Sequence, residues 1–138
     1  HNPVGRVWTR AELEALADCC LRHNLIVIAD EIHHDLVFQP HTMFLTVSPE
    51  IAQRTILCTA PSKTFNLAGL VGSYHIVYND YLRDRLDKFE SLSHYNSCNV
   101  LSMHALIGAY SYEGEEWLDE HYDDARRRRI YPNAMTES

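Results

Sequence analysis

Two of the 138 residues are lysines, Lys63 and Lys88, and Lys63 stands where a lysine could do chemistry. It follows the apolar run Thr55–Thr59 and opens a stretch of small and hydroxyl-bearing residues that ends at Gly69. A lysine amine that is partly removed from water can lose its proton and attack a carbonyl group. The simpler alternative is an exposed loop lysine, and composition alone favours that alternative.

A carboxylate holds the matching place after a second apolar run. Asp30 directly follows Leu25–Ala29, and by itself it is well explained as a strand-end carboxylate or a helix cap. Ligands of parallel α/β sheets bind beyond the carboxyl ends of the strands. If the two runs are neighbouring strands, Asp30 and Lys63 face one crevice, as a cofactor with a cationic ring nitrogen and an aldehyde would require.

The elements that must position these residues alternate between helix and strand. Thr9 and Glu12 form the pattern of a capping box, which predicts a helix from there to about His23. One apolar stripe along it consists of Leu13, Leu16, Ala17, Cys20 and Leu21. The continuous apolar residues 25–29 and 55–59 are typical of strands that are buried on both faces of a parallel sheet.

The remaining elements complete an α/β layer. We expect a short helix at 49–53, a strand nearer a sheet edge at 73–78, and helices at roughly 80–92 and 96–112. This order predicts an α/β fold with a mainly parallel sheet flanked by helices and right-handed crossovers. From residue 123 to the end the chain has no apolar period, and we expect a frayed tail there.

Composition and charge narrow the class of protein. The chain carries 12 Lys and Arg against 19 Asp and Glu, a net charge of −7, which does not favour binding to nucleic acid or to an anionic membrane. The apolar runs are much shorter than the roughly 20 residues of a membrane helix. Four cysteines without a Cys-x-x-Cys pair suggest a reducing, cytoplasmic compartment.

Three blocks of sequence, in order and spacing, resemble a known enzyme family. They are Asn2–Gly5, Asp30–His33 and Ser62–Leu70. The chain resembles the fold-type I, class I/II aminotransferase-like enzymes that use pyridoxal 5'-phosphate (PLP), and is most similar to their cystathionine β-lyase group of the MalY and PatB type. The resemblance implies that residues 1–120 are part of the large PLP-binding domain and that 121–138 are an off-pattern tail.

The resemblance also implies a role for each matching residue. Lys63 would hold the cofactor as a Schiff base and later move protons at the substrate Cα, and Asp30 would pair with the pyridine nitrogen. Asn2 would bind the phenolic oxygen and Ser62 the phosphate. His33 stands where aminotransferases often have a tyrosine that touches the same phenolic oxygen.

The implied reaction is α,β-elimination from cystathionine or another cysteine S-conjugate, which releases a thiol, pyruvate and ammonia. The substrate would thus be a small sulfur-containing amino acid, and the relatives imply a homodimer. Two alternatives stay open: an aminotransferase with the same cofactor machinery, and a catalytically inactive fragment of either enzyme.

The chain departs from the family pattern in several places. Many relatives have an arginine eight residues after the lysine to bind the phosphate, and this chain has Val71. The Gly-rich phosphate turn, the aromatic that stacks on the ring and the small C-terminal domain have no counterpart, and the chain opens at His1 as if within a loop. A separate reading of Glu31, His33, His34, Asp35 and His41 is a metal site, although no ligand spacing supports it.

Overall fold

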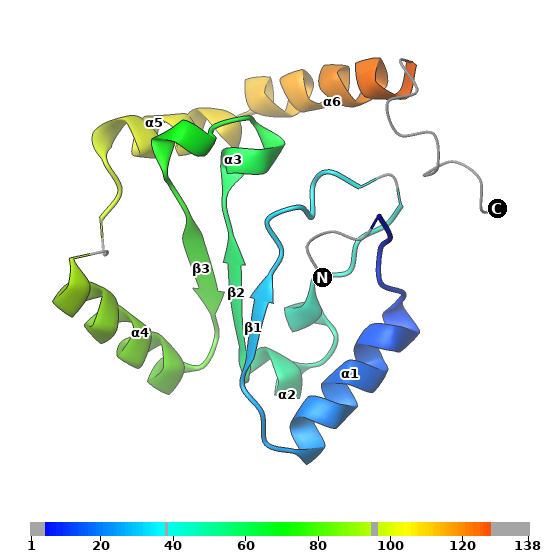
Figure 1. The fold of residues 1–138 in the computed structure, drawn as a ribbon, viewed down its shortest axis with the longest axis vertical. Coiled ribbons are helices and arrows are strands. Elements are labelled where there is room, and N and C mark those ends of the chain that lie inside the picture. The colour runs from blue at the N-terminus through cyan, green and yellow to red at the C-terminus, as the bar shows by residue number, and fades with distance from the viewer. Residues whose placement is uncertain (1–4, 38, 95–96, 128–138) are drawn as a thin grey trace.

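The computed structural model describes residues 5–37, 39–94 and 97–127. Its centre is a three-stranded sheet in the order β1 (Val27–Asp30), β2 (Thr55–Thr59) and β3 (Tyr74–Val77). Helices lie beside both edges of this sheet and across the carboxyl end of β2 (Figure 1). The α/β fold expected from the sequence is confirmed.

The sheet is mixed. β1 and β2 are parallel, with Val27 opposite Thr55 and Asp30 opposite Cys58. β3 is an edge strand, as expected, and runs antiparallel to β2. The link from β2 to β3 contains only two short helices, α3 (Pro61–Thr64) and η2 (Ala68–Leu70), whereas a parallel return normally needs a long crossover element.

The first helix, α1 (Arg10–Arg22), begins as predicted. Thr9 and Glu12 form both hydrogen bonds of the capping box, and the carboxylate of Glu12 also pairs with Arg6 at 3.0 Å. The hydrogen bond from Arg6 is the largest cause of the low pKa of Glu12, which is about 2. One residue of the predicted apolar stripe, Leu16, does not join the core, because 42% of it is exposed.

The other elements follow the predicted order with shifted ends. The predicted helices are α2 (Pro49–Ala52), α4 (Asp80–Ser93) and α5 (Val100–Ala109). Two further elements, η1 (Phe44–Thr46) and α6 (Tyr112–Arg127), were not predicted. The expectation of an irregular chain from residue 123 is wrong as far as Arg127, because α6 continues to that residue. Residues 128–138 lie outside the described part of the chain.

The core lies on one face of the sheet. Leu13, Ala17, Cys20, Phe44 and Ile51 form a cluster against which Val27 and Ala29 of β1 pack. A second cluster forms around Leu57 of β2, which is fully buried. The prediction that β1 is buried on both faces is wrong for this chain, because Ile28 points away from these clusters and is 72% exposed.

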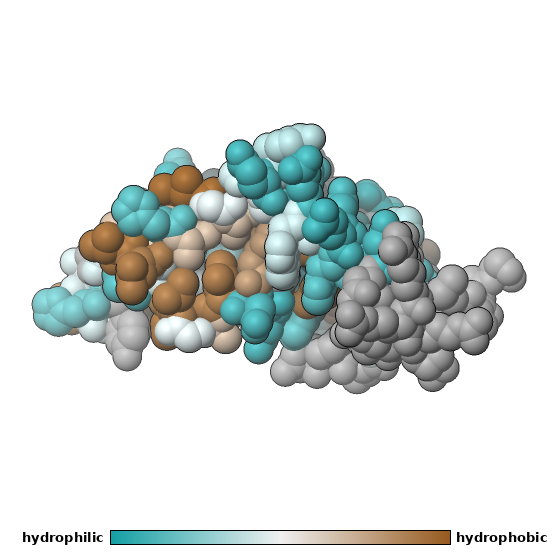
Figure 2. Space-filling view, turned by 90° about the horizontal axis from the view of Figure 1, so that it is seen from above, coloured by the Kyte–Doolittle hydropathy of each residue, from teal (hydrophilic) through white to brown (hydrophobic). Residues whose placement is uncertain are grey.

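Apolar side chains also gather at the surface over α5. Val100, Leu101 and Ile107 are each more than 60% exposed, and Figure 2 shows hydrophobic residues at one end of this view and hydrophilic residues beside them. Among the described residues, none of the helices combines the length and the apolar character that spanning a membrane requires.

Candidate active site

Asp30 is the last residue of β1 and lies on the face of the sheet opposite the core, called the open face below. The strand alternates between half-buried and exposed residues, so Asp30 shares its face with Ile28. Its Oδ1 accepts a hydrogen bond from the amide of Ile32 at 3.3 Å. No cation among the described residues forms an ion pair with this carboxylate, which leaves it able to bind a positively charged group of a ligand.

Lys63 lies in α3, the single helical turn that follows β2 directly. Pro61 stands at the first position of this turn, where its fixed φ favours a helix. The side chain of Lys63 is exposed, while Ser62 before it is half-buried. The Lys63 amine also has no carboxylate partner within the described part of the chain.

The parallel pairing of β1 and β2 brings the segments that carry Asp30 and Lys63 to the same end of the sheet. Both strands have their carboxyl ends there, and α3 lies at the end of β2 (Figure 1). Between them on the open face lies Cys58, the strand partner of Asp30. Burial, and then the charges of Asp30 and Glu90, raise the pKa of the Cys58 thiol. It therefore stays protonated at neutral pH and adds no negative charge beside Asp30.

The turn after β1 contains a charged pair that contacts α3. His34 Nε2 lies 3.0 Å from Asp35 Oδ1, and Thr64 Oγ1 donates a hydrogen bond of 2.9 Å to Asp35 Oδ2. Thr64 is the neighbour of Lys63 and is 2% exposed. The pair thus joins the segment that carries Asp30 to the segment that carries Lys63.

The geometry around His34 indicates a doubly protonated ring. Its Nδ1 lies 2.7 Å from the carbonyl oxygen of Glu31, and its Nε2 faces the Asp35 carboxylate. These two nearest partners are acceptors only, so the short contacts favour a ring that donates from both nitrogens. The hydrogen bond with Asp35 raises the pKa of His34, and the same bond lowers the pKa of Asp35.

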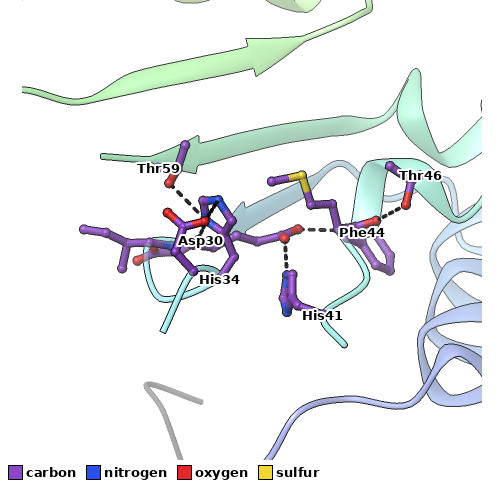
Figure 3. Close-up of polar contacts among 10 residues, drawn as sticks. Asp30, His34, His41, Phe44, Thr46 and Thr59 are labelled. Carbon is purple, nitrogen blue, oxygen red and sulfur yellow. Dashed lines mark hydrogen bonds and ion pairs between the residues drawn. The ribbon is translucent and has the colours of Figure 1, made fainter. Parts of the chain in front are cut away.

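A second carboxylate fixes the rest of the same loop. Glu31 Oε2 lies 2.6 Å from His41 Nε2, and Glu31 Oε1 accepts a hydrogen bond from the amide of Phe44 at 2.8 Å. Figure 3 shows these contacts together with the one from Thr59 to His34, which is 3.5 Å long. The side chain of Glu31 thus joins the start of the loop to residues 41 and 44 at its end, and His34 bonds back to the Glu31 carbonyl within the turn.

The histidine-rich segment is used for ion pairs. His34 and His41 each take a different carboxylate partner, and His33 is half-buried in the turn with no part in either pair. Within the described residues, no three histidine, cysteine or acidic side chains come together in a way that would hold a metal ion. Asn2, the remaining predicted site residue, lies outside the described residues.

Sequence reasoning missed the role of Asp35 and Thr64. Their contact joins positions 29 residues apart, and no local pattern encodes it. The available signal was the hydroxyl of Thr64 directly after Lys63, together with a run of ionisable residues directly after Asp30.

The His34–Asp35 pair predicts a pH dependence of stability. A raised pKa means that the contribution of His34 is complete below its ordinary value of 6.5 and is lost as the pH rises through the raised value. The lowered pKa of Asp35 makes its contribution complete above 3.8 and lost on further acidification. Both contributions are therefore complete between pH 3.8 and 6.5.

We expect His34→Gln to lower the free energy of unfolding by on the order of 1–3 kcal/mol at pH 5.5, the usual contribution of a hydrogen bond to a charged group. The loss should be smaller at pH 9 than at pH 5.5, because the contribution of the His34 proton is lost as the pH rises through its raised pKa. Denaturant unfolding at both pH values measures it, with the exposed His104→Gln as control. A loss that grows with rising pH would contradict the charged pair.

The site suits a ligand that carries both a cationic nitrogen and a carbonyl carbon. Asp30 supplies a carboxylate and Lys63 an amine, neither with an ion-pair partner among the described residues, and Ser62 supplies a hydroxyl; all three come from the two segments at one end of the sheet. PLP has the matching groups: a pyridine nitrogen, an aldehyde and a phosphate. One feature fits less well, because Val71 offers no charge to a phosphate and is 84% exposed.

Fold and site together describe part of an α/β enzyme domain with a lysine at the carboxyl end of a strand. Residues 1–131 match the family described as Aminotransferase class I and II. This chain belongs to that family.

Two curated relatives and one solved structure show the similarity. Cystathionine beta-lyase PatB of Bacillus subtilis is 39% identical over 122 residues, which are 87% of this chain and 31% of that protein. Protein MalY of Escherichia coli is 42% identical over 122 residues, 86% of this chain and 30% of that protein. The PLP-bound C-S lyase from Staphylococcus hominis has a TM-score of 0.80 at 33% identity, and the match covers 99% of this chain and 34% of that one.

The resemblance to the MalY and PatB group is thus confirmed. The chain spans about a third of the length of these two curated relatives.

Proposed function

We propose that the native protein carrying this chain is a PLP-dependent carbon–sulfur β-lyase. Its substrates would be cystathionine or other cysteine S-conjugates, with a thiol, pyruvate and ammonia as products. The observation that carries the proposal is the placement of Asp30 and Lys63 after two adjacent parallel strands, in a chain 39% identical to a protein named as a cystathionine β-lyase.

Five residues would hold the cofactor. Lys63 would bind it covalently, Asp30 would pair with its ring nitrogen, and Ser62 would contact its phosphate. Asn2 and His33 would contact the phenolic oxygen, an expectation that rests on the family pattern alone. When bound, PLP supplies an electron sink for the negative charge that develops at the substrate Cα.

The chain's own residues would then act on protons and charge. The Lys63 amine, once free, would take the proton from the substrate Cα as a general base. Asp30 would keep a positive charge on the ring nitrogen by placing a carboxylate next to it. The protonated Cys58 on the same face would leave Asp30 as the charged member of this strand pair.

An aminotransferase is the second candidate, favoured by the family to which residues 1–131 belong. We further expect residues 1–120 to form part of the large PLP-binding domain, the native protein to be a cytoplasmic homodimer, and its substrate to be a small sulfur amino acid. Gel filtration with light scattering would test the dimer.

One assay separates the two activities. The purified native protein is incubated with PLP and L-cystathionine, with and without an added 2-keto acid, and pyruvate is measured enzymatically. We expect pyruvate to form without the keto acid, because elimination needs no amino-group acceptor. Turnover that depends strictly on the keto acid would show an aminotransferase, and no turnover under either condition would reject both proposals.

A further inference from the structure

We propose that Asp35 is a positioning residue for Lys63 and acts through the hydroxyl of Thr64, which fixes the turn α3 against the loop that follows Asp30. That the position of Lys63 matters for catalysis rests on the proposed function. The contact itself does not depend on the proposed function.

The contact is made at a well-defined place. Thr64 Oγ1 donates to Asp35 Oδ2 at 2.9 Å, and Thr64 is almost completely removed from solvent. Its partner carboxylate is also largely covered, with a quarter of the side chain exposed. Hydrogen bonds to charged groups are stronger than neutral ones when water is excluded. This one therefore restrains both segments that it joins.

The turn α3 needs such a restraint because it has little stability of its own. It contains four residues, and Ala60 at its N-terminus provides no side-chain cap. Two backbone hydrogen bonds close it, from Phe65 N to Pro61 O at 2.9 Å and from Leu67 N to Ser62 O at 3.0 Å. A single isolated turn is unstable in water, because nucleation fixes several dihedral angles for one hydrogen bond.

The charge of Asp35 is also maintained by its surroundings. His34 lies against its other oxygen, and Glu31 and His41 from the same loop and Tyr110 at the end of α5 are the further titratable groups near this pair. With His34 donating from both ring nitrogens, Asp35 remains a carboxylate. It can then accept the hydrogen bond from the Thr64 hydroxyl over the whole neutral pH range.

Packing offers a second way to hold the turn. Phe65, the next residue after Thr64, contacts Tyr110 edge-on with ring centroids 5.8 Å apart, and its ring lies 6.0 Å from that of Trp117. If packing alone fixed α3, Thr64 would matter only for the space that it fills. A test must therefore separate the hydroxyl group of Thr64 from its volume.

Two substitutions of Thr64 have opposite expectations under these two explanations. Thr64→Val keeps the shape and removes the hydroxyl, whereas Thr64→Ser keeps the hydroxyl and removes a methyl group. Hydrogen exchange of the Phe65 and Leu67 amides, read by mass spectrometry or NMR in the native protein without PLP, reports how firmly α3 is closed. We expect exchange about tenfold faster in the Val variant, the effect of losing a hydrogen bond to a charged group, and near wild type in the Ser variant.

The role in positioning Lys63 has its own readout. PLP is added to the native protein, borohydride fixes the adduct, and peptide mapping gives the rate of labelling at Lys63. The rate of PLP labelling at Lys88, which is exposed on α4, serves as the internal standard for each sample. We expect Thr64→Val to slow the labelling of Lys63 about tenfold and Thr64→Ser to leave it unchanged.

A double-mutant cycle covers the case in which Thr64→Val fails to fold. Asp35→Ala removes the same hydrogen bond from the other side, so it should speed amide exchange in α3 to a similar extent. The double variant Asp35→Ala with Thr64→Ser should exchange no faster than Asp35→Ala alone, because serine removes only a methyl group that does not carry the restraint.

The possible failures are distinguishable. A Ser variant that exchanges as fast as the Val variant or faster, or an Asp35→Ala variant that exchanges at the wild-type rate, would overturn the inference and leave packing as the explanation. Absence of any Lys63 adduct in the wild type would reject the proposed function instead, while amide exchange in α3 would still decide the role of Asp35.

Discussion

Lys63→Ala should remove covalent cofactor binding and lower turnover of cystathionine by about 10⁴-fold, the upper range for the loss of a general base. The residue is assigned two tasks, as the amine that holds PLP and as the base at the substrate Cα. Alanine can perform neither task. The measurements are the visible absorbance of the purified native protein with PLP, the borohydride-fixed adduct and the rate of pyruvate release.

The chain offers a matched control for this substitution. Lys88, the second lysine, is exposed on α4, and Lys88→Ala should retain the wild-type spectrum and rate. Both variants should unfold close to the wild type, since an exposed lysine without a described ion pair contributes little to stability. An unchanged spectrum and rate in Lys63→Ala would remove this residue from the active site, wherever the cofactor binds.

Local signals in the sequence were sufficient for most of the elements. The strand at 55–59 ends where predicted, because a run of β-branched and apolar residues is followed by Pro61 at the start of a helix. The start of α1 was equally well marked by Thr9 and Glu12, whose capping box forms in full. The parallel pairing of the two apolar runs also followed from their order, and with it the shared edge of Asp30 and Lys63.

Features that depend on distant parts of the chain were not visible in this way. The exposure of Ile28 depends on which segments cover each face of the sheet, and a β-branched run reads the same whether one or both faces are covered. The contact between Asp35 and Thr64 joins two loops, for which sequence has no periodic signal. The helix α6 was not predicted because many of its residues are acidic, although Trp117 and His121 stack one turn apart in it.

The loop after β1 has a different function from the one its composition suggested. His34 pairs with Asp35 and His41 with Glu31, and the carboxylate of each pair ties the loop to a neighbouring segment: Glu31 to the amide of Phe44, and Asp35 to Thr64. Asp30 is left out of both pairs. A carboxylate kept free while its neighbours are paired is available to a ligand, and this makes its substitution informative.

Asp30→Ala should leave PLP attached to Lys63 but lower the rate of pyruvate release by about 10³-fold. A carboxylate about 4 Å from a cationic nitrogen contributes on the order of 4 kcal/mol at the effective dielectric constant of a partly exposed site. That energy is lost when the carboxylate is removed, and each 1.4 kcal/mol corresponds to about a tenfold change in rate. The protein should remain folded, because the described Asp30 side chain accepts one hydrogen bond, a long one of 3.3 Å from the amide of Ile32.

Two further variants separate charge from shape. Asp30→Asn keeps the size of the side chain and loses its charge, so it should be nearly as slow as Asp30→Ala, while Asp18→Ala, at an exposed position of α1, should match the wild type. The adduct on Lys63 is counted in every sample, so that a slow rate is not mistaken for a missing cofactor. Full activity in Asp30→Asn with the adduct present would show that the carboxylate charge plays no part in the reaction, and the ring nitrogen would then need another partner.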